Sequence, residues 1–158
     1  MGSGYMRDRQ RRREDARVWL DYARGDLLTA QRAMADPAVE EAALFHCQQT
    51  AEKALKAYLI VAGASDLPRT HLLRNLVRML DELGAATPSP EAVRFLDVHG
   101  VSVRYPGTPR PDAETVAVAL QHARHVLDFV QAQLEFLDHT HGQPATNDPG
   151  PGEDDPAD

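Results

Sequence analysis

The chain contains a single cysteine, Cys47, among its 158 residues. One cysteine excludes a disulfide framework within the chain and any zinc site built on several cysteines. No run of about 18 apolar residues occurs, so the sequence predicts no membrane-spanning helix. No apolar stretch follows the basic residues near the N-terminus, which argues against a secretory signal. These absences favour a protein of the reducing cytoplasm with no membrane association.

Basic residues are fewer than acidic ones, with 17 Lys and Arg against 24 Asp and Glu, and the formal net charge is −7. Attraction to phosphate dominates nucleic-acid affinity, so this charge by itself argues against a nucleic-acid-binding protein. The charges are unevenly spread, however. Residues 142–158 are rich in proline and acidic residues and contain no basic residue. We expect a disordered acidic tail there, and the rest of the chain is close to neutral.

The N-terminal segment has the opposite character. Residues 1–6 predict a flexible N-terminus of the kind that an expression tag leaves behind. Residues 7–17 contain six arginines and three acidic residues. Such a run is typical of a solvated helix start. The alternative is an arm that contacts phosphate or an acidic partner.

Residues 7–141 have helical periodicity throughout and predict one all-α domain. In the first helix, apolar residues recur at alternating spacings of four and three: Ala16, Leu20, Ala23, Leu27, Ala30 and Met34. Further helices are predicted over about 39–62, 70–83, 90–99 and 113–137, and no stretch predicts a confident strand. We therefore expect an up-and-down antiparallel bundle of four long or medium helices plus one short helix. Surplus apolar surface on the first and last helices favours a homodimer.

Several residues are suited to the predicted helix ends. Gly63 fits the C-terminal cap of the second helix. Thr70 is the expected N-cap of the third helix, Ser89 precedes a proline at the start of the fourth, and Asp112 is the expected cap of the fifth.

The densest polar cluster lies on the second helix and includes the only two lysines of the chain, Lys53 and Lys56. Gln49, Lys53 and Lys56 follow one face at one-turn spacing, and Gln48 and Glu52 form a row beside them. One interpretation is a solvated face with Glu52 and Lys56 paired. The other is a polar groove in which amide and ammonium groups bind a nucleotide or backbone phosphate.

Histidines offer further candidates. His71 follows Arg69 at the start of the third helix, where backbone N–H groups attract anions, although it can equally serve to order the loop. Arg94 and His99 are five positions apart and could converge on one phosphodiester, with His99 moving a proton and Arg94 stabilising charge. His122 and His125 lack a third ligand nearby. The sequence thus predicts neither a metal site nor a cofactor.

Taken together, these motifs resemble the HEPN domain family. The matching pieces are Trp19-Leu20, Ala23-Arg24-Gly25-Asp26-Leu27, the run from Phe45 to Ala57, Thr70-His71-Leu72-Leu73, Arg104-Tyr105-Pro106 and the long final helix. The string Gln-Gln-x-x-Glu-Lys-x-x-Lys is the most specific of them. With Arg-Tyr-Pro it indicates a subgroup of the family.

The resemblance implies a cytoplasmic homodimer that pairs with a small nucleotidyltransferase protein in a toxin–antitoxin or stress module. A nucleotide or RNA would bind a groove formed by a set of polar residues: Gln49, Lys53, Lys56, His71, Arg104 and Tyr105. Many relatives are metal-independent endoribonucleases with Arg-x4–6-His, a spacing that Arg94 and His99 meet. A tyrosine two places after the histidine, which a partner would modify, is absent, since that position is Val101. The alternatives are therefore an endoribonuclease toxin using Arg94 and His99, or a non-catalytic protein-interaction bundle.

Overall fold

The computed structural model describes residues 2–102, 106–107 and 109–140, which form five α-helices and no strand. The helices are α1 (Gly2–Met34), α2 (Glu40–Ala62), α3 (Leu73–Glu82), α4 (Pro90–Ser102) and α5 (Ala113–Thr140). The predicted all-α class is confirmed. None of these helices combines the length and the apolar character needed to cross a membrane. The expected acidic tail lies outside the described residues.

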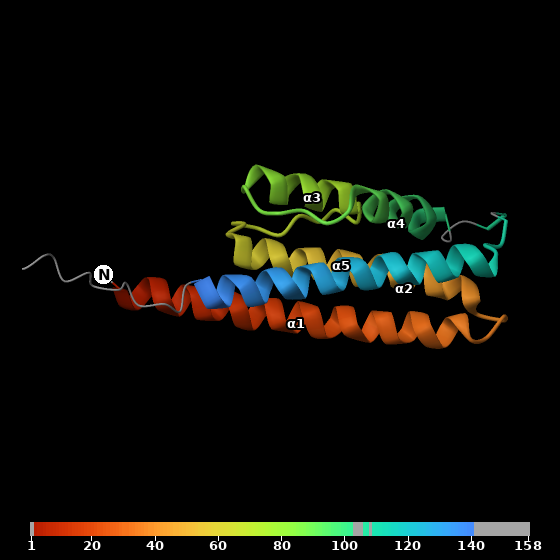
Figure 1. The fold of residues 1–158 in the computed structure, drawn as a ribbon, viewed down its shortest axis with the longest axis horizontal. Helices are drawn as coiled ribbons and strands as arrows, with labels where there is room; N and C mark the ends of the chain where they lie inside the picture. Colours follow the sequence, from red (N-terminus) through yellow and green to blue (C-terminus); the bar gives the residue numbers. More distant parts are fainter. Residues whose placement is uncertain (1, 103–105, 108, 141–158) are drawn as a thin grey trace, which may run out of the picture.

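Three long helices form the body of the molecule, and two short helices cover one side of it. α1, α2 and α5 lie side by side, while α3 and α4 follow one another in a row along α2 (Figure 1). α4 also contacts α5. α2 packs against each of the other four helices. Polar residues on α2 are therefore brought against several different elements.

Small residues set the close packing of α1 on α2. Ala16, Ala23 and Ala30 on α1 are fully buried, as are Ala51 and Ala54 on α2. Side chains of this size let two helix backbones approach closely. Larger core residues come from α2 itself and from α3 and α4, as the fully buried leucines show: Leu55, Leu59, Leu73, Leu76, Leu80 and Leu96.

Most helix ends follow the sequence pattern. Gly63 has a φ of 100° and caps α2, because a left-handed conformation is open to glycine. The Asp112 carboxylate accepts a hydrogen bond from the Thr115 N–H at 2.7 Å and caps α5. The Ser89 hydroxyl accepts a longer bond from the Ala92 N–H at 3.4 Å at the start of α4.

The expected N-cap of the third helix is wrong. α3 begins at Leu73, and the hydroxyl of Thr70 instead accepts a hydrogen bond from the Leu72 N–H, before the helix starts. The α3 cap comes from another helix. The buried Asp97 carboxylate of α4 accepts from the backbone N–H groups of Leu73 at 2.7 Å and Arg74 at 3.0 Å. Packing of α4 on α3 therefore replaces a local capping residue.

Candidate functional site

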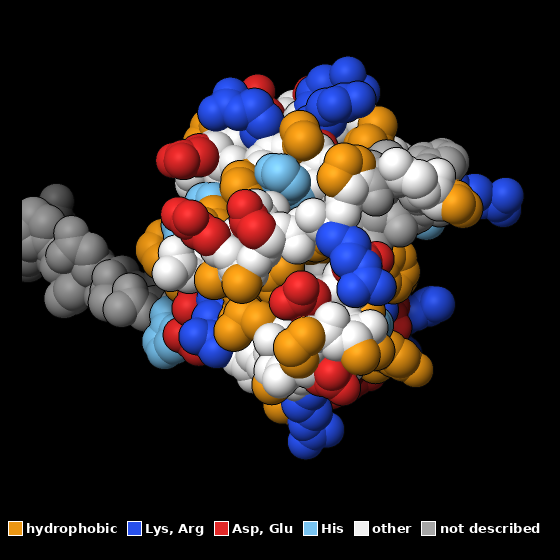
Figure 2. Space-filling model, turned by 90° about the vertical axis from the view of Figure 1, so that its right-hand side faces the viewer, with side chains coloured by type: hydrophobic (Ala, Val, Ile, Leu, Met, Phe, Trp, Pro, Cys, Tyr) orange, Lys and Arg blue, Asp and Glu red, His pale blue; other side chains and the backbone are white. Residues whose placement is uncertain are grey.

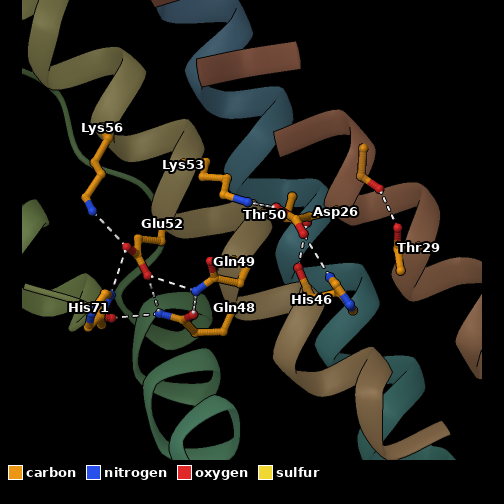
Figure 3. A network of polar contacts seen from close by, with 11 residues as sticks. Asp26, Thr29, His46, Gln48, Gln49, Thr50, Glu52, Lys53, Lys56 and His71 are labelled. Carbon is orange, nitrogen blue, oxygen red and sulfur yellow. Dashed lines mark hydrogen bonds and ion pairs between the residues drawn. The ribbon is translucent and has the colours of Figure 1, made fainter. Parts of the chain in front are cut away.

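The polar residues of α2 point in two directions and form two separate clusters (Figure 3). One cluster is centred on Glu52 and faces the loop before α3. The other is centred on Asp26 of α1. Lys53 and Lys56 are only about 60° apart around α2, yet Lys53 pairs with Asp26 of α1 and Lys56 pairs with Glu52 of α2 itself.

The Glu52 cluster joins four side chains through one carboxylate. Lys56 donates to Oε1 at 2.8 Å, and Nδ1 of His71 lies 3.2 Å from the same oxygen. Gln48 and Gln49 donate to Oε2 at 3.3 and 3.1 Å. Burial raises the pKa of Glu52, but the hydrogen bonds and charge of Lys56, with hydrogen bonds from His71 and Gln48, bring that pKa below its ordinary value.

This cluster also fixes the segment that leads into α3. Gln48 donates a hydrogen bond to the backbone carbonyl of His71 at 2.7 Å. The Lys56 ammonium lies 5.5 Å from the centre of the Trp19 ring, a cation–π contact with α1. Lys56 and Gln48 are buried, whereas the side chain of His71 is 63% exposed. The cluster thus connects α1, α2 and the loop before α3, and His71 is its exposed end.

The Asp26 cluster joins α1 to the middle of α2. Nδ1 of His46 lies 2.8 Å from Oδ1 of Asp26, and the Lys53 ammonium binds the other oxygen of the same carboxylate. Lys53 also lies 5.8 Å from the centre of the Tyr22 ring. A carboxylate placed against Nδ1 fixes the orientation of an imidazole ring, as in sites where histidine moves protons.

An open groove of about 390 Å³ lies over the Asp26 cluster. Residues of α1 and Lys53 of α2 line it: Asp21, Tyr22, Gly25, Asp26, Thr29 and Lys53. Asp21 is paired with Arg24 at 2.9 Å, and Asp26 with Lys53, so the charges along the groove are largely balanced. The Tyr22 side chain is 65% exposed. The groove therefore offers an aromatic face, an ammonium group and a hydroxyl.

The predicted nucleotide-binding residues are divided between the two clusters. Gln49, Lys56 and His71 meet at Glu52, as shown in Figure 3. Lys53 turns away from them toward Asp26. The expected pairing of Glu52 with Lys56 is confirmed, although the pair is buried instead of solvated. Arg104 and Tyr105 lie outside the described residues.

The predicted catalytic pair lies on α4. This helix continues past His99 to Ser102, so the two residues are about 140° apart around one regular helix. Arg94 is exposed, and His99 is half-buried with its ring 4.3 Å from the ring of Phe95. Within one protomer, the two side chains therefore leave the helix in different directions.

Two residues of the site were not singled out from the sequence. Asp26 and His46 both belong to the motif pieces of the first two helices, but only packing of α1 against α2 places them together. Asp26 is the only acidic residue in the motif piece from Ala23 to Leu27. This was the feature of the sequence that could have identified it as a site residue. In the part of the chain that the structure describes, no group of three His, Cys, Asp or Glu could hold a metal ion.

Comparison with known proteins gives one family. A model described as the HEPN domain matches residues 16–133. TT1696 from Thermus thermophilus is 29% identical with a TM-score of 0.64, over 74% of this chain and 96% of that one. ST0689, described as an archaeal HEPN homologue, is 23% identical with a TM-score of 0.58, over 75% and 96% of the two chains. The second likeness shows the fold alone. No curated protein matches the chain.

Proposed function

The chain belongs to the HEPN domain family, and from that premise we propose that it binds a nucleotide or RNA at the groove beside Lys53. The observation that carries the proposal is the joint position of Lys53 and Tyr22 on this groove. An ammonium group suits phosphate, and an exposed aromatic face suits stacking of a base. The Glu52 cluster contributes indirectly. Gln49 and Lys56 donate to the Glu52 carboxylate, and this carboxylate contacts the exposed His71 side chain. Arg104 and Tyr105 complete the proposed binding set.

The balance of charge indicates how such a ligand is held. Lys53 is already paired with Asp26, so an incoming phosphate must compete with that carboxylate. The groove therefore lacks the strong positive field that a long polyanion needs. Stacking on an aromatic side chain contributes about 1–3 kcal/mol per base. We expect stacking on Tyr22 to supply much of the affinity, with Lys53 selecting for phosphate.

Titration of the protein with a ribonucleoside triphosphate and a short RNA tests this function. Replacement Tyr22→Ala or Lys53→Gln should weaken binding roughly tenfold, the effect of about 1.4 kcal/mol. Arg78→Gln, at an exposed arginine of α3, is the matched control and should bind as the wild type does. Equal affinity of all four proteins at unchanged helical CD would refute the proposed site.

We further propose that the chain belongs to the motif subgroup, and that this membership indicates its protein partner. A chain with Gln48-Gln49-x-x-Glu52-Lys53 and Arg104-Tyr105-Pro106 is expected to work as a homodimer with a small nucleotidyltransferase protein in a toxin–antitoxin or stress module. Co-expression of the protein with a nucleotidyltransferase encoded beside it should yield a stable complex. A protein partner without any nucleotide or RNA affinity would favour the non-catalytic interaction bundle instead.

A metal-independent endoribonuclease using Arg94 and His99 is the second candidate. It is favoured by the exposure of Arg94 next to Val98, which is 60% exposed, on a face of α4 that a second copy could cover. In such a dimer, Arg94 of one copy can approach His99 of the other. The enzyme should cleave RNA in the presence of a chelator, and His99→Ala should abolish cleavage. If the wild-type protein neither arrests growth nor cleaves RNA, the endoribonuclease candidate is excluded.

A further inference from the structure

Three arginines follow one face of α1 beside the end of α5. Arg9, Arg13 and Arg17 are spaced four residues apart, so they form a row along the helix. They line a groove of about 370 Å³ together with Leu134 and Leu137 of α5. Figure 1 shows the first turns of α1 next to the last turns of α5. The family match covers residues 16–133, so this groove is formed mainly by helix extensions beyond it.

The arginine row carries more positive charge than its neighbours balance. Arg13 is paired with Asp138 of α5 at 2.7 Å, and both side chains are partly exposed. The Arg9 guanidinium lies 5.7 Å from the centre of the Tyr5 ring. Counting Asp138 and the neighbouring Glu14 against the three arginines leaves an excess of one positive charge.

Other charges around the groove are already engaged. Arg12 binds Asp8 at 3.0 Å and donates to the carbonyls of Ile60 and Ala64 at the end of α2. Glu14 accepts a hydrogen bond from the uncharged Gln10 at 3.1 Å and keeps its negative charge. At the opposite end of the bundle, basic side chains lie at separate points with acidic ones among them (Figure 2). The arginine row is therefore a local feature of the α1–α5 end.

We propose that the arginine row is the docking site of the chain's own acidic segment, residues 142–158. This segment directly follows α5, one wall of the groove, and it has no basic residue among its acidic ones: Asp148, Glu153, Asp154, Asp155 and Asp158. The ion pair of Arg13 with Asp138 already joins an acid of α5 to the row. Docking of the segment continues that contact along α1.

The length of the segment allows this contact. Asp148 is eight positions after Thr140, a stretch that can span about 26 Å, whereas Arg9 and Arg17 are about 12 Å apart along the helix. A short tether gives an effective concentration of about millimolar, so the segment needs little intrinsic affinity. Each exposed ion pair contributes only about 0.2–1 kcal/mol, and several together hold the segment at low salt. A docked segment excludes other polyanions from the groove.

A spin label placed in the acidic segment tests the proposal in the full chain. Ala157→Cys provides the attachment site, since Cys47 is fully buried and burial raises the pKa of its thiol to about 12. Near 0.01 M salt, the label should remove most of the NMR amide intensity of residues 9–17. Near 1 M salt, where the Debye length falls from about 30 to 3 Å, that intensity should return.

Two triple variants separate docking from general charge effects. Arg9→Gln, Arg13→Gln and Arg17→Gln together should abolish the broadening. The matched triple Arg69→Gln, Arg74→Gln and Arg78→Gln, at exposed arginines before and within α3, should retain it. Broadening that is absent at low salt, or that survives in the first triple, overturns the proposal.

A labelled RNA oligonucleotide tests the competing occupant. Displacement of the spin label by RNA supports the proposal, because both then use one groove. RNA can instead bind through the same three arginines while the spin label never broadens their amide signals. That result would make the groove an RNA site and overturn the proposal. The Tyr22 and Lys53 variants report on a different groove, so failure of the proposed function is distinguishable from failure of this inference.

Discussion

Glu52 is 4% exposed, and its carboxylate contacts four side chains. Burying an ionised carboxylate costs several kcal/mol, and this cost is offset only when charge and hydrogen bonds replace water. Lys56 supplies the opposite charge, and the amides of Gln48 and Gln49 fill the remaining positions. The arrangement holds His71 at the surface.

Replacement Glu52→Gln should lower the free energy of unfolding by about 3 kcal/mol at pH 7, because it leaves the Lys56 ammonium buried without its counter-charge. The folded pKa of Glu52 lies below its ordinary value of 4.5. Its contribution is therefore present above about pH 4.5 and is lost as the pH falls through the folded pKa. Urea unfolding of both proteins from pH 7 to 3 should show the difference shrinking in the acid range.

The exposed Glu82→Gln is the matched control for this experiment. Glu82 lies at the end of α3, and its replacement should change stability by less than about 0.5 kcal/mol at any pH. A difference between wild type and Glu52→Gln that stays constant from pH 7 to 3 contradicts the assigned role of the carboxylate.

At the scale of the element, α3 depends on a residue from another helix. Ten residues are too few for a stable isolated helix, so packing and capping must supply its stability. Asp97→Ala should cost about 1–2 kcal/mol, as loss of a cap does, and should speed amide exchange at Leu73 and Arg74. Asp81→Ala, at an exposed acid near the end of α3, should leave that exchange unchanged. Equal exchange in both variants would show that Asp97 does not cap α3.

Two helical glycines are expected to respond in opposite ways to alanine. A Cβ at Gly100 of α4 would lie 2.5 Å from Cβ of Gln48, so Gly100→Ala should destabilise the protein by about 1–3 kcal/mol. A Cβ at Gly25 of α1 would meet nothing within 4 Å, so Gly25→Ala should stabilise it by about 0.5–1 kcal/mol. Thermal unfolding measures both. Similar shifts in the two variants would contradict the close approach of α4 to α2.

For the whole molecule, the proposed endoribonuclease requires a homodimer whose interface includes α4, whereas the apolar pattern of the sequence favours an interface on the first and last helices. Val98 is 60% exposed and lies one turn after Arg94. Val98→Glu should convert a dimer of twice the 17.4 kDa chain mass into a monomer in sedimentation equilibrium, because a buried carboxylate opposes an apolar interface. Val39→Glu, at a half-exposed position between α1 and α2, should stay dimeric. A dimer unaffected by the charge at Val98 would place the interface elsewhere.

The sequence by itself determined the helical class and most helix ends. Apolar spacings of three and four are a local property, and so are Gly63, Ser89 and Asp112 as caps, because each acts on its own helix. The family resemblance also came from local motifs, and the match over residues 16–133 bears it out.

Only the tertiary structure decided which polar side chains meet. Gln49, Lys53 and Lys56 share one face in the sequence pattern, yet Lys53 pairs with Asp26 of α1 and Lys56 with Glu52. Likewise, Asp97 caps α3 only because α4 packs against it. The physical reason is the same in each case. A buried charge takes the partner that packing brings within hydrogen-bond distance, and sequence spacing along one helix does not specify which neighbouring helix that will be.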